Sequence, residues 1–193
     1  MIILHIILAS FDSYLLLKKY DDLPKRKKMF RQIDSIAIYN SQRSIEDVRD
    51  GLLARILERG KSLLVRLDLG SDIVSQISDV AVNEGIHTGI FSIIGALTNA
   101  QIAFYDQESH EYHELMVDEP VELVSCTGNV STRDGKLFVH AHAVLAGSEG
   151  DCRGGHLIRG DIFAAEMYMQ ELLGSPLIRA HDSTTGLCLW GDG

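Results

Sequence analysis

The chain has 193 residues, of which 46% are hydrophobic and 23% charged, with 17 glycines but only 3 prolines. This length supports one substantial core, and this composition excludes disordered and collagen-like classes of protein. The formal charge of −9 divides into +3 for residues 1–60 (11 Lys/Arg, 8 Asp/Glu) and −12 for residues 61–193 (7 Lys/Arg, 19 Asp/Glu). Residues 61–193 are so acidic that they disfavour nucleic acid as a partner, because negative charge repels phosphates.

Residues 1–60 are interpreted as an N-terminal extension. Its first nine residues are apolar, but Ser10 and Asp12 then interrupt the run. The segment is too short to span a bilayer, and no basic residues precede it as in a signal peptide, so no membrane partner is expected. Met29 offers an alternative start, which would make the preceding residues an artefact of gene annotation.

Two further features belong to this extension. The basic run from Lys25 to Lys28 fits either a solvated linker or a DNA-contacting patch, and the linker is favoured because short basic runs are common in proteins. The segment from Ser44 to Gly60 predicts a helix, with Ser44 as its cap, Gly60 at its end and a leucine-rich stripe between them.

Residues 61–190 form the predicted main domain. A strand over 61–70 is followed by a helix over 71–86, in which apolar residues recur at helical spacing between a Ser71 N-cap and a Gly85 terminator. Strands are then predicted on either side of Gly95 within 88–106, over 113–131 with breaks at Pro120 and Gly128, over 135–147, over 154–172 as one or two strands, and over 186–190. One helix followed by many short strands predicts an α+β domain with a mostly antiparallel sheet and one main packed helix.

The order of these pieces resembles a known family. "LVRLDLG", "GIFSIIGALTNAQIAFYD", "EPVELVSCTGNVS", "DGKLFVHAHAVLAG", "GGHLIRG" and "TTGLCLW" follow one another as in the PPC (plants and prokaryotes conserved) domain, also called the PD1-like DNA-binding family. The resemblance covers about two-thirds of the chain and leaves residues 1–60 unexplained.

The resemblance implies a compact antiparallel α+β domain that assembles into homotrimers. It also implies kinship with α-acetolactate decarboxylase, a zinc enzyme whose metal is held by histidines. Plant members accompany AT-hooks and contact transcription factors, whereas this chain has no Arg-Gly-Arg-Pro core and carries "EPVELV" where plant members have Gly-Arg-Phe-Glu-Ile-Leu.

Three histidines form the candidate metal site. His140 and His142 share one face of the predicted strand, because side chains alternate along a strand. His156 follows after a length suited to a hairpin, and Gly154 and Gly155 just before it allow close backbone approach. Three imidazoles suit Zn²⁺ or another divalent transition metal, and the resemblance implies the same set. The alternative is a row of polar side chains on a solvated sheet face.

Other chemistry-bearing residues are weaker candidates. Glu166 stands in an otherwise apolar strand and is either a fourth ligand or general base, or a charge that discourages aggregation at a sheet edge. His87 is expected in a loop, and His110 and His113 in a polar turn. Cys152 is interpreted as a spare thiol, because the three cysteines form no CxxC pair.

Three functions are compatible with these features. The first is a cytoplasmic, homotrimeric metal-binding module that recognises a small ligand or a protein partner and acts in regulation. The second is a DNA-associated regulator, which rests on the family name and the basic run but conflicts with the acidic body. The third is a metal-dependent lyase or hydrolase, which rests on kinship with the decarboxylase and on an open coordination position.

Overall fold

The structure is a computed structural model and describes residues 54–191. One helix and eight strands follow in chain order: β1 (Glu58–Leu67), α3 (Ile73–Glu84), β2 (Gly89–Asp106), β3 (Glu111–Val117), β4 (Val121–Arg133), β5 (Lys136–Ala146), β6 (Cys152–Leu173), β7 (Ile178–His181) and β8 (Cys188–Trp190). The α+β class with one packed helix is therefore confirmed. The basic run and most of the helix predicted over 44–60 lie outside the described residues, but residues 58–60 belong to β1 and not to a helix.

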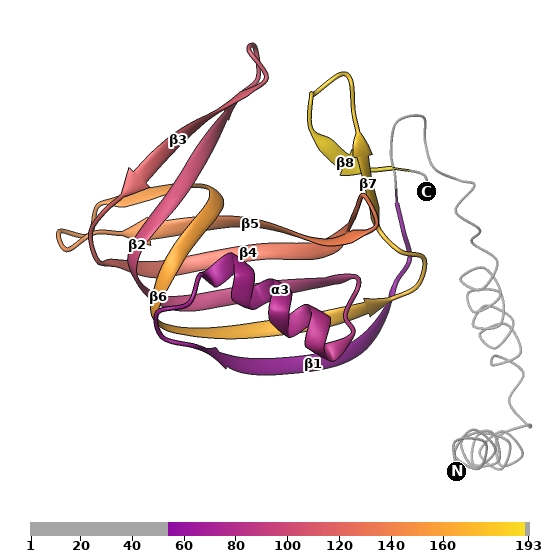
Figure 1. Cartoon of the computed structure of the whole chain (residues 1–193), viewed down its shortest axis with the longest axis horizontal. Coiled ribbons are helices and arrows are strands. Elements are labelled where there is room, and N and C mark those ends of the chain that lie inside the picture. The colour runs from indigo at the N-terminus through magenta and orange to yellow at the C-terminus, as the bar shows by residue number, and fades with distance from the viewer. Residues whose placement is uncertain (1–53, 192–193) are drawn as a thin grey trace, which may run out of the picture. The chain divides into compact units, whose positions relative to one another are not determined.

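The strands form one sheet with the order β3-β2-β6-β5-β4-β7-β8, and β1 pairs with the second half of β6. The two long strands, β2 and β6, bend and change neighbours along their length, so that β2 pairs with β4 in its first half and with β3 in its second. Within the described range every pairing is antiparallel except the short one between β4 and β7. Figure 1 shows the β2–β3 hairpin and the β7–β8 hairpin rising from the same side of the sheet.

Two glycines explain why the strands are longer than expected. Gly95 does not divide residues 88–106 into two strands, because it sits at a register shift inside the continuous strand β2. Gly128 does not break β4 either, and lies paired with Ala141 of β5. A glycine within a strand therefore marks a bulge or a close backbone contact here, rather than an end. Pro120 does end a segment, since it lies between β3 and β4.

Helix α3 packs on the sheet through one face. Its buried residues Ile73, Ile77 and Ala81 belong to the same apolar cluster as Ile93 of β2 and Met167 of β6. Fully burying a side chain of this size contributes about 1.5–3 kcal/mol, so this face fixes the helix on the sheet. No helix of residues 54–191 is long and apolar enough to cross a membrane.

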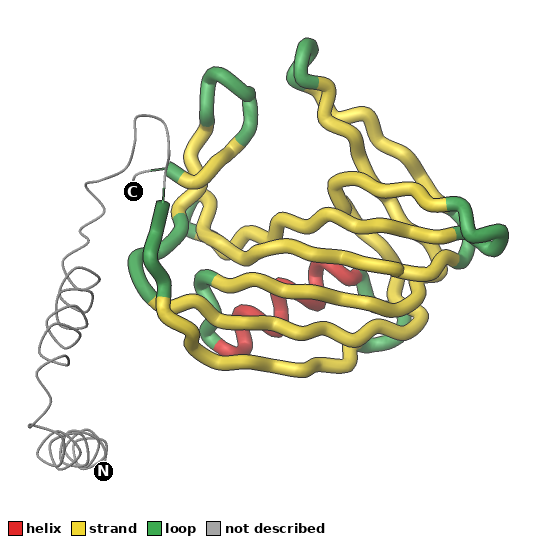
Figure 2. Tube along the Cα trace, turned by 180° about the vertical axis from the view of Figure 1, so that it is seen from behind, coloured by secondary structure: helices red, strands yellow, loops and turns green. Residues whose placement is uncertain are grey.

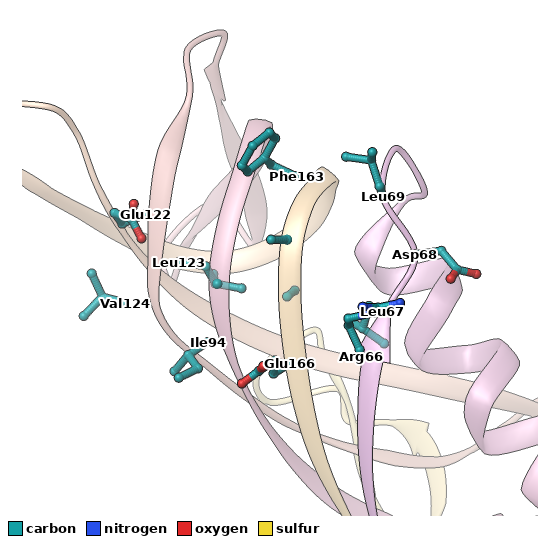
Figure 3. Close-up of a pocket in the computed structure, with 13 residues that line it drawn as sticks. Arg66, Leu67, Asp68, Leu69, Ile94, Glu122, Leu123, Val124, Phe163 and Glu166 are labelled. Atoms are coloured by element: carbon teal, nitrogen blue, oxygen red, sulfur yellow. The ribbon is translucent and has the colours of Figure 1, made fainter.

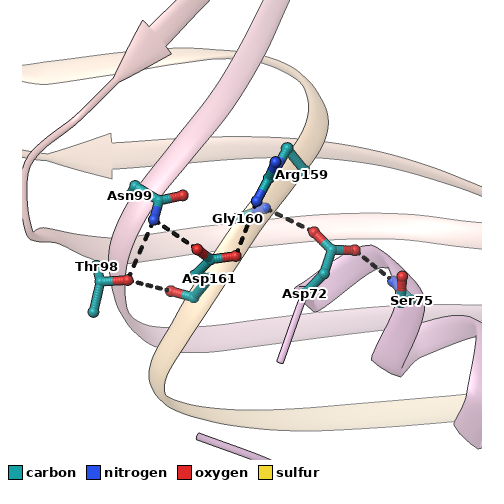
Figure 4. A network of polar contacts seen from close by, with 7 residues as sticks. All are labelled: Asp72, Ser75, Thr98, Asn99, Arg159, Gly160 and Asp161. Atoms are coloured by element: carbon teal, nitrogen blue, oxygen red, sulfur yellow. Dashed lines mark hydrogen bonds and ion pairs between the residues drawn. The ribbon is translucent and has the colours of Figure 1, made fainter. Parts of the chain in front are cut away.

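The helix begins at a cap that also fastens it to β6. Asp72, and not the predicted Ser71, is the N-cap: its Oδ1 accepts a hydrogen bond from the Ser75 amide at 2.8 Å, and its Oδ2 accepts one from the Gly160 amide at 3.1 Å. Figure 4 shows this cap beside Asp161, which receives hydrogen bonds from Asn99 and Arg159. The hydrogen bond from Asn99 is the main reason why the pKa of Asp161 is lowered.

The helix ends at Gly85, as predicted. This residue has φ 69°, and its amide points to the carbonyls of Ala81 and Val82. A left-handed C-cap of this kind favours glycine because a Cβ atom would be strained there.

The side chains of the sheet alternate between this core and a face that the helix does not cover. In Figure 2, seen from behind, the strands lie in front of the helix and no described element covers them. Large hydrophobic side chains on β1, β2, β4 and β6 are exposed, and the strand register and a shared cavity put them on one side of the sheet. We call them the apolar strip: Leu64, Ile90, Ile94, Val124, Phe163 and Tyr168. The sheet is therefore apolar on both faces in this region.

Candidate metal centre

The hairpin formed by β5 and β6 brings the three histidines together. His142 of β5 lies directly opposite His156 of β6 in the antiparallel register. His140 is two residues away on β5, so its side chain points to the same side as that of His142. The residues between and after them, Ala141 and Ala143, are buried in the core, which directs all three imidazoles away from it.

The three rings converge on one region. The ring centroids of His140 and His142 are 5.2 Å apart, those of His140 and His156 are 5.2 Å apart, and those of His142 and His156 are 5.5 Å apart. One ring nitrogen of each residue lies within 4.8 Å of the other two. The sequence prediction that these side chains gather at one place is met by the coordinates.

Glycines keep the strands around the histidines close. A Cβ atom on Gly155 would stand 2.6 Å from the carbonyl oxygen of Ala103 on β2, and one on Gly154 would stand 3.0 Å from the carbonyl oxygen of Ala143 on β5. A Cβ atom on Gly128 of β4 would overlap the carbonyl oxygen of His140. The Gly-Gly pair therefore allows the close backbone approach expected from the sequence.

Burial keeps two of the imidazoles neutral. The pKa of His140 is lowered to about 4, first because the ring is removed from water and then because the cation of Arg179 and the two other histidines are near. Burial, together with His142 and Arg179, also lowers the pKa of His156. A neutral imidazole has a free lone pair at neutral pH, and this is the form that binds a metal ion.

Arg179 of β7 lies beside His140. Its Nη2 is 3.5 Å from the Nδ1 of His140, and the same nitrogen donates a hydrogen bond to the Asn129 Oδ1 at 2.9 Å. Its Nε donates to the Ser131 hydroxyl at 2.9 Å, and its Nη1 donates to the carbonyl of Cys188 at 2.8 Å. Burial lowers the pKa of this guanidinium, as expected for a cation taken out of water.

Two tyrosines of the β2–β3 hairpin stand on another side of the cluster. The Tyr112 ring lies 5.3 Å from that of His156 and 4.9 Å from that of Tyr105, measured between centroids. The Tyr105 hydroxyl donates a hydrogen bond to the Thr185 carbonyl at 2.7 Å. This bond ties the β2–β3 hairpin to the turn between β7 and β8.

One buried atom in the cluster has no partner. The Nδ1 of His156 is buried and has no hydrogen-bond partner, as donor or acceptor, within the described part of the chain. Buried polar atoms are almost always satisfied, and one that is not calls for an ion or another group. The site therefore consists of three imidazoles, two of which are held neutral, and one of them carries the unpartnered nitrogen. This set fits a borderline transition metal such as Zn²⁺ better than a hard cation that prefers oxygen.

The structure does not bring Glu166 to the histidines. Glu166 pairs with Arg66 of β1 and Ile94 of β2, and lines a cavity of about 840 Å³ to which none of the three histidines contributes. Figure 3 shows its carboxylate beside Ile94 in this cavity, with Phe163 at the other end. Among residues 54–191 the group that could hold an ion consists of the three histidines alone, so Glu166 is not part of it.

The remaining candidates lie apart from the cluster as well. His87 is exposed in the loop after α3. His110 and His113 are exposed at the β2–β3 hairpin, where His110 stacks on Tyr105 with centroids 6.2 Å apart. Cys152 is exposed and free at the start of β6.

Sequence reasoning missed Arg179, Asn129 and the two tyrosines. Arg179 contacts His140 across 39 residues of sequence, through a parallel pairing of only two residues between β4 and β7. Its one local signal is a cation within the short apolar segment "PLIRA", which does not indicate a partner.

Comparison with known proteins gives matches to family and fold. The family model described as the Plants and Prokaryotes Conserved (PCC) domain matches residues 55–173. A metal-containing protein from Archaeoglobus fulgidus is 42% identical, with a TM-score of 0.71 over 73% of this chain and 100% of that one. A plant- and prokaryote-conserved (PPC) protein from Pyrococcus horikoshii is 37% identical, with a TM-score of 0.69 over 73% and 98% of the two chains.

A more distant structure agrees in fold alone. A protein of Bacteroides thetaiotaomicron, named as a candidate DNA-binding protein, is 21% identical with a TM-score of 0.63 over 71% of this chain and 98% of that one. A search of curated proteins finds no significant match. Arg179 lies beyond the residues that the family model matches.

Proposed function

The chain belongs to the Plants and Prokaryotes Conserved (PCC) domain family, and we propose that it is a metal-binding regulatory protein that holds one divalent transition-metal ion, preferably Zn²⁺, on His140, His142 and His156. The observation that carries this proposal is the convergence of three imidazoles, with ring nitrogens within 4.8 Å of one another. The metal content of the Archaeoglobus relative, named as a metal-containing protein, supports it.

The ligand set favours zinc with an open coordination position. Tetrahedral zinc with bonds of about 2.0–2.1 Å to nitrogen places its ligands roughly 3.4 Å apart, so small rotations of the three rings suffice to close the site. Three protein ligands leave one position open, and a bound ion would supply a Lewis acid to an oxygen atom there. We infer that a small ligand or a protein partner is recognised at this open position.

Self-association is the second part of the proposal. The apolar strip exposes large side chains, including Leu64 at 86%, Phe163 at 62% and Ile94 at 58%. Contiguous exposed apolar surface of this kind marks a protein contact. Arg66 and Glu166 lie among these residues, so the strip carries both signs of charge and can complement a second copy of itself. A homotrimer, as the family resemblance implies, would bury the strip without an added partner.

Metal analysis of the purified full chain tests the metal site. Elemental analysis and competition titration with a zinc chelator should give one ion per chain. His140→Ala should weaken zinc binding about 100-fold or more, because loss of an outer-shell partner alone costs roughly 10–100-fold. The matched control His87→Ala, in an exposed loop, should bind zinc as the natural chain does. A natural chain that neither contains nor takes up a transition metal would contradict the proposal.

A further inference from the structure

We propose that the histidine cluster and Arg179 together bind a small oxyanion, a carboxylate or a phosphate. The inference rests on the proposed metal site and adds the chemical class of its ligand. Arg179 is 9% exposed, and its edge reaches the cluster through the 3.5 Å approach of Nη2 to His140 Nδ1.

Within residues 54–191, the charge of Arg179 has no anionic hydrogen-bond or ion-pair partner. Its hydrogen-bond acceptors are the Ser131 hydroxyl, the Cys188 carbonyl, the Asn129 amide oxygen and the His140 ring, all of which are neutral. None of the ion pairs among residues 54–191 includes it. Buried cations in proteins are normally paired with an anion, because an uncompensated buried charge costs several kcal/mol.

A metal ion on the histidines increases this excess of positive charge. The guanidinium carries one positive charge, a divalent ion would add two, and imidazoles that bind a metal ion are neutral. The site would then hold three positive charges, and no carboxylate of residues 54–191 forms an ion pair with Arg179. Like charges at this range repel strongly away from water. An anion that binds the open metal position and faces Arg179 turns this repulsion into attraction, and a neutral ligand does not.

The guanidinium is also held in place before any ligand arrives. Three hydrogen bonds of 2.8–2.9 Å fix it, and it stacks over the rings of Phe138 at 5.2 Å and Trp190 at 5.7 Å. A preorganised donor binds an anion without a further loss of side-chain entropy. The ring of Tyr112 lies 5.3 Å from that of His156, and this tyrosine is 43% exposed.

The natural chain contains a reporter for this event. Trp190 is its single tryptophan and lies on the guanidinium. Co²⁺ is loaded in place of zinc, and the metal-loaded full chain is titrated in separate arms with oxalate, with inorganic phosphate and with uncharged ethylene glycol. The visible Co²⁺ spectrum and Trp190 fluorescence are recorded together. We expect saturable changes in both signals with at least one anion and none with ethylene glycol. The anion that binds more tightly shows whether the site prefers a carboxylate or a phosphate.

Two variants test the role of Arg179. Arg179→Gln removes the charge, and Asn129→Asp places a carboxylate against the guanidinium with almost no change of shape. Each should weaken anion binding about 10–100-fold, since hydrogen bonds to charged groups contribute roughly 1.5–3 kcal/mol, while both still bind one Co²⁺. If Arg179→Gln does not fold, Asn129→Asp alone tests whether the charge of Arg179 binds the anion.

The outcomes separate the two proposals. A chain that binds Co²⁺ but neither anion, or variants that bind anions as tightly as the natural chain, overturn the oxyanion inference and leave the metal site standing. A natural chain that takes up no Co²⁺ overturns the metal site and this inference with it.

Discussion

The histidine cluster and the apolar strip are both built from side chains that point away from the core, and both use β6. The first half of this strand supplies His156, and the second half supplies Phe163 and Tyr168. A cavity of about 840 Å³ belongs to the strip, and no histidine lines it. The cluster instead gathers lone pairs, one buried cation and an orphaned nitrogen. Donor chemistry, and not the size of a hollow, therefore locates the site that can bind a metal.

Breaking the apolar strip should have the largest effect. Ile94→Asp puts a charge in the centre of the strip, where Ile94 is 58% exposed, and burying an unpaired carboxylate between copies is costly. We expect the dissociation constant of the oligomer to rise about 100-fold or more, measured by size-exclusion chromatography with light scattering.

The same variant separates the two regions. Metal stoichiometry should remain one ion per chain in Ile94→Asp. The matched control is Val82→Asp on helix α3, which is also an exposed apolar position but lies outside the strip, and it should leave the oligomer intact. Dissociation by both variants, or by neither, would refute the strip as the contact surface.

A substitution on β4, the strand that pairs with the histidine strand β5, should have an intermediate effect. In Gly128→Ala the new methyl group would overlap the carbonyl oxygen of His140 and the Phe91 ring. Strain of this kind costs about 1–3 kcal/mol, and β5 must move, so we expect a lower free energy of unfolding and roughly 10-fold weaker zinc binding. Urea unfolding and zinc competition measure the two quantities.

A glycine outside the cluster provides the control for this change. A Cβ atom on Gly191 would make only an ordinary contact, 3.5 Å from the Ala180 Cβ. Gly191→Ala should therefore change the free energy of unfolding by less than about 0.5 kcal/mol and leave zinc affinity unaltered. Equal losses in the two variants would mean that close packing of β4 on β5 does not shape the cluster.

The smallest effect is expected for Glu166→Gln, which tests whether the apolar strip and the histidine cluster are independent. Glu166→Gln removes a charge from the cavity of the strip and not from the cluster. Zinc affinity should be unchanged, and the free energy of unfolding should shift by no more than about 0.5 kcal/mol. Chelator titration would show a 10-fold or larger loss of zinc affinity if Glu166 were a ligand after all.

The fold and the placement of the histidines could be predicted because both depend on local pattern. Alternation along a strand sets His140 and His142 on one face, and the Gly-Gly-His segment after a turn returns His156 to their side. That the three bind a metal stays a prediction. The strand boundaries could not be predicted from the glycines. Gly95 and Gly128 look like strand ends in the sequence, but Gly95 lies at a bulge and Gly128 at a close strand pairing.

The rest of the site depends on distances that sequence does not carry. Arg179 reaches His140 through the register of a two-residue parallel pairing, and no local periodicity specifies such a contact. The residue type of Glu166 allows a ligand, a general base or a charge at a sheet edge, but it does not reveal the ten positions of β6 and several register shifts that separate Glu166 from His156. Residue type suggests chemistry, but the register of the sheet decides which residues meet.

X-ray absorption at the zinc K-edge of the zinc-loaded full chain shows directly whether His140, His142 and His156 bind the metal ion. We expect three imidazole nitrogens at about 2.0–2.1 Å from the ion, with oxygen completing the coordination, and one imidazole fewer in His142→Ala. A sulfur neighbour at about 2.3 Å, or a spectrum that does not change in His142→Ala, would contradict it.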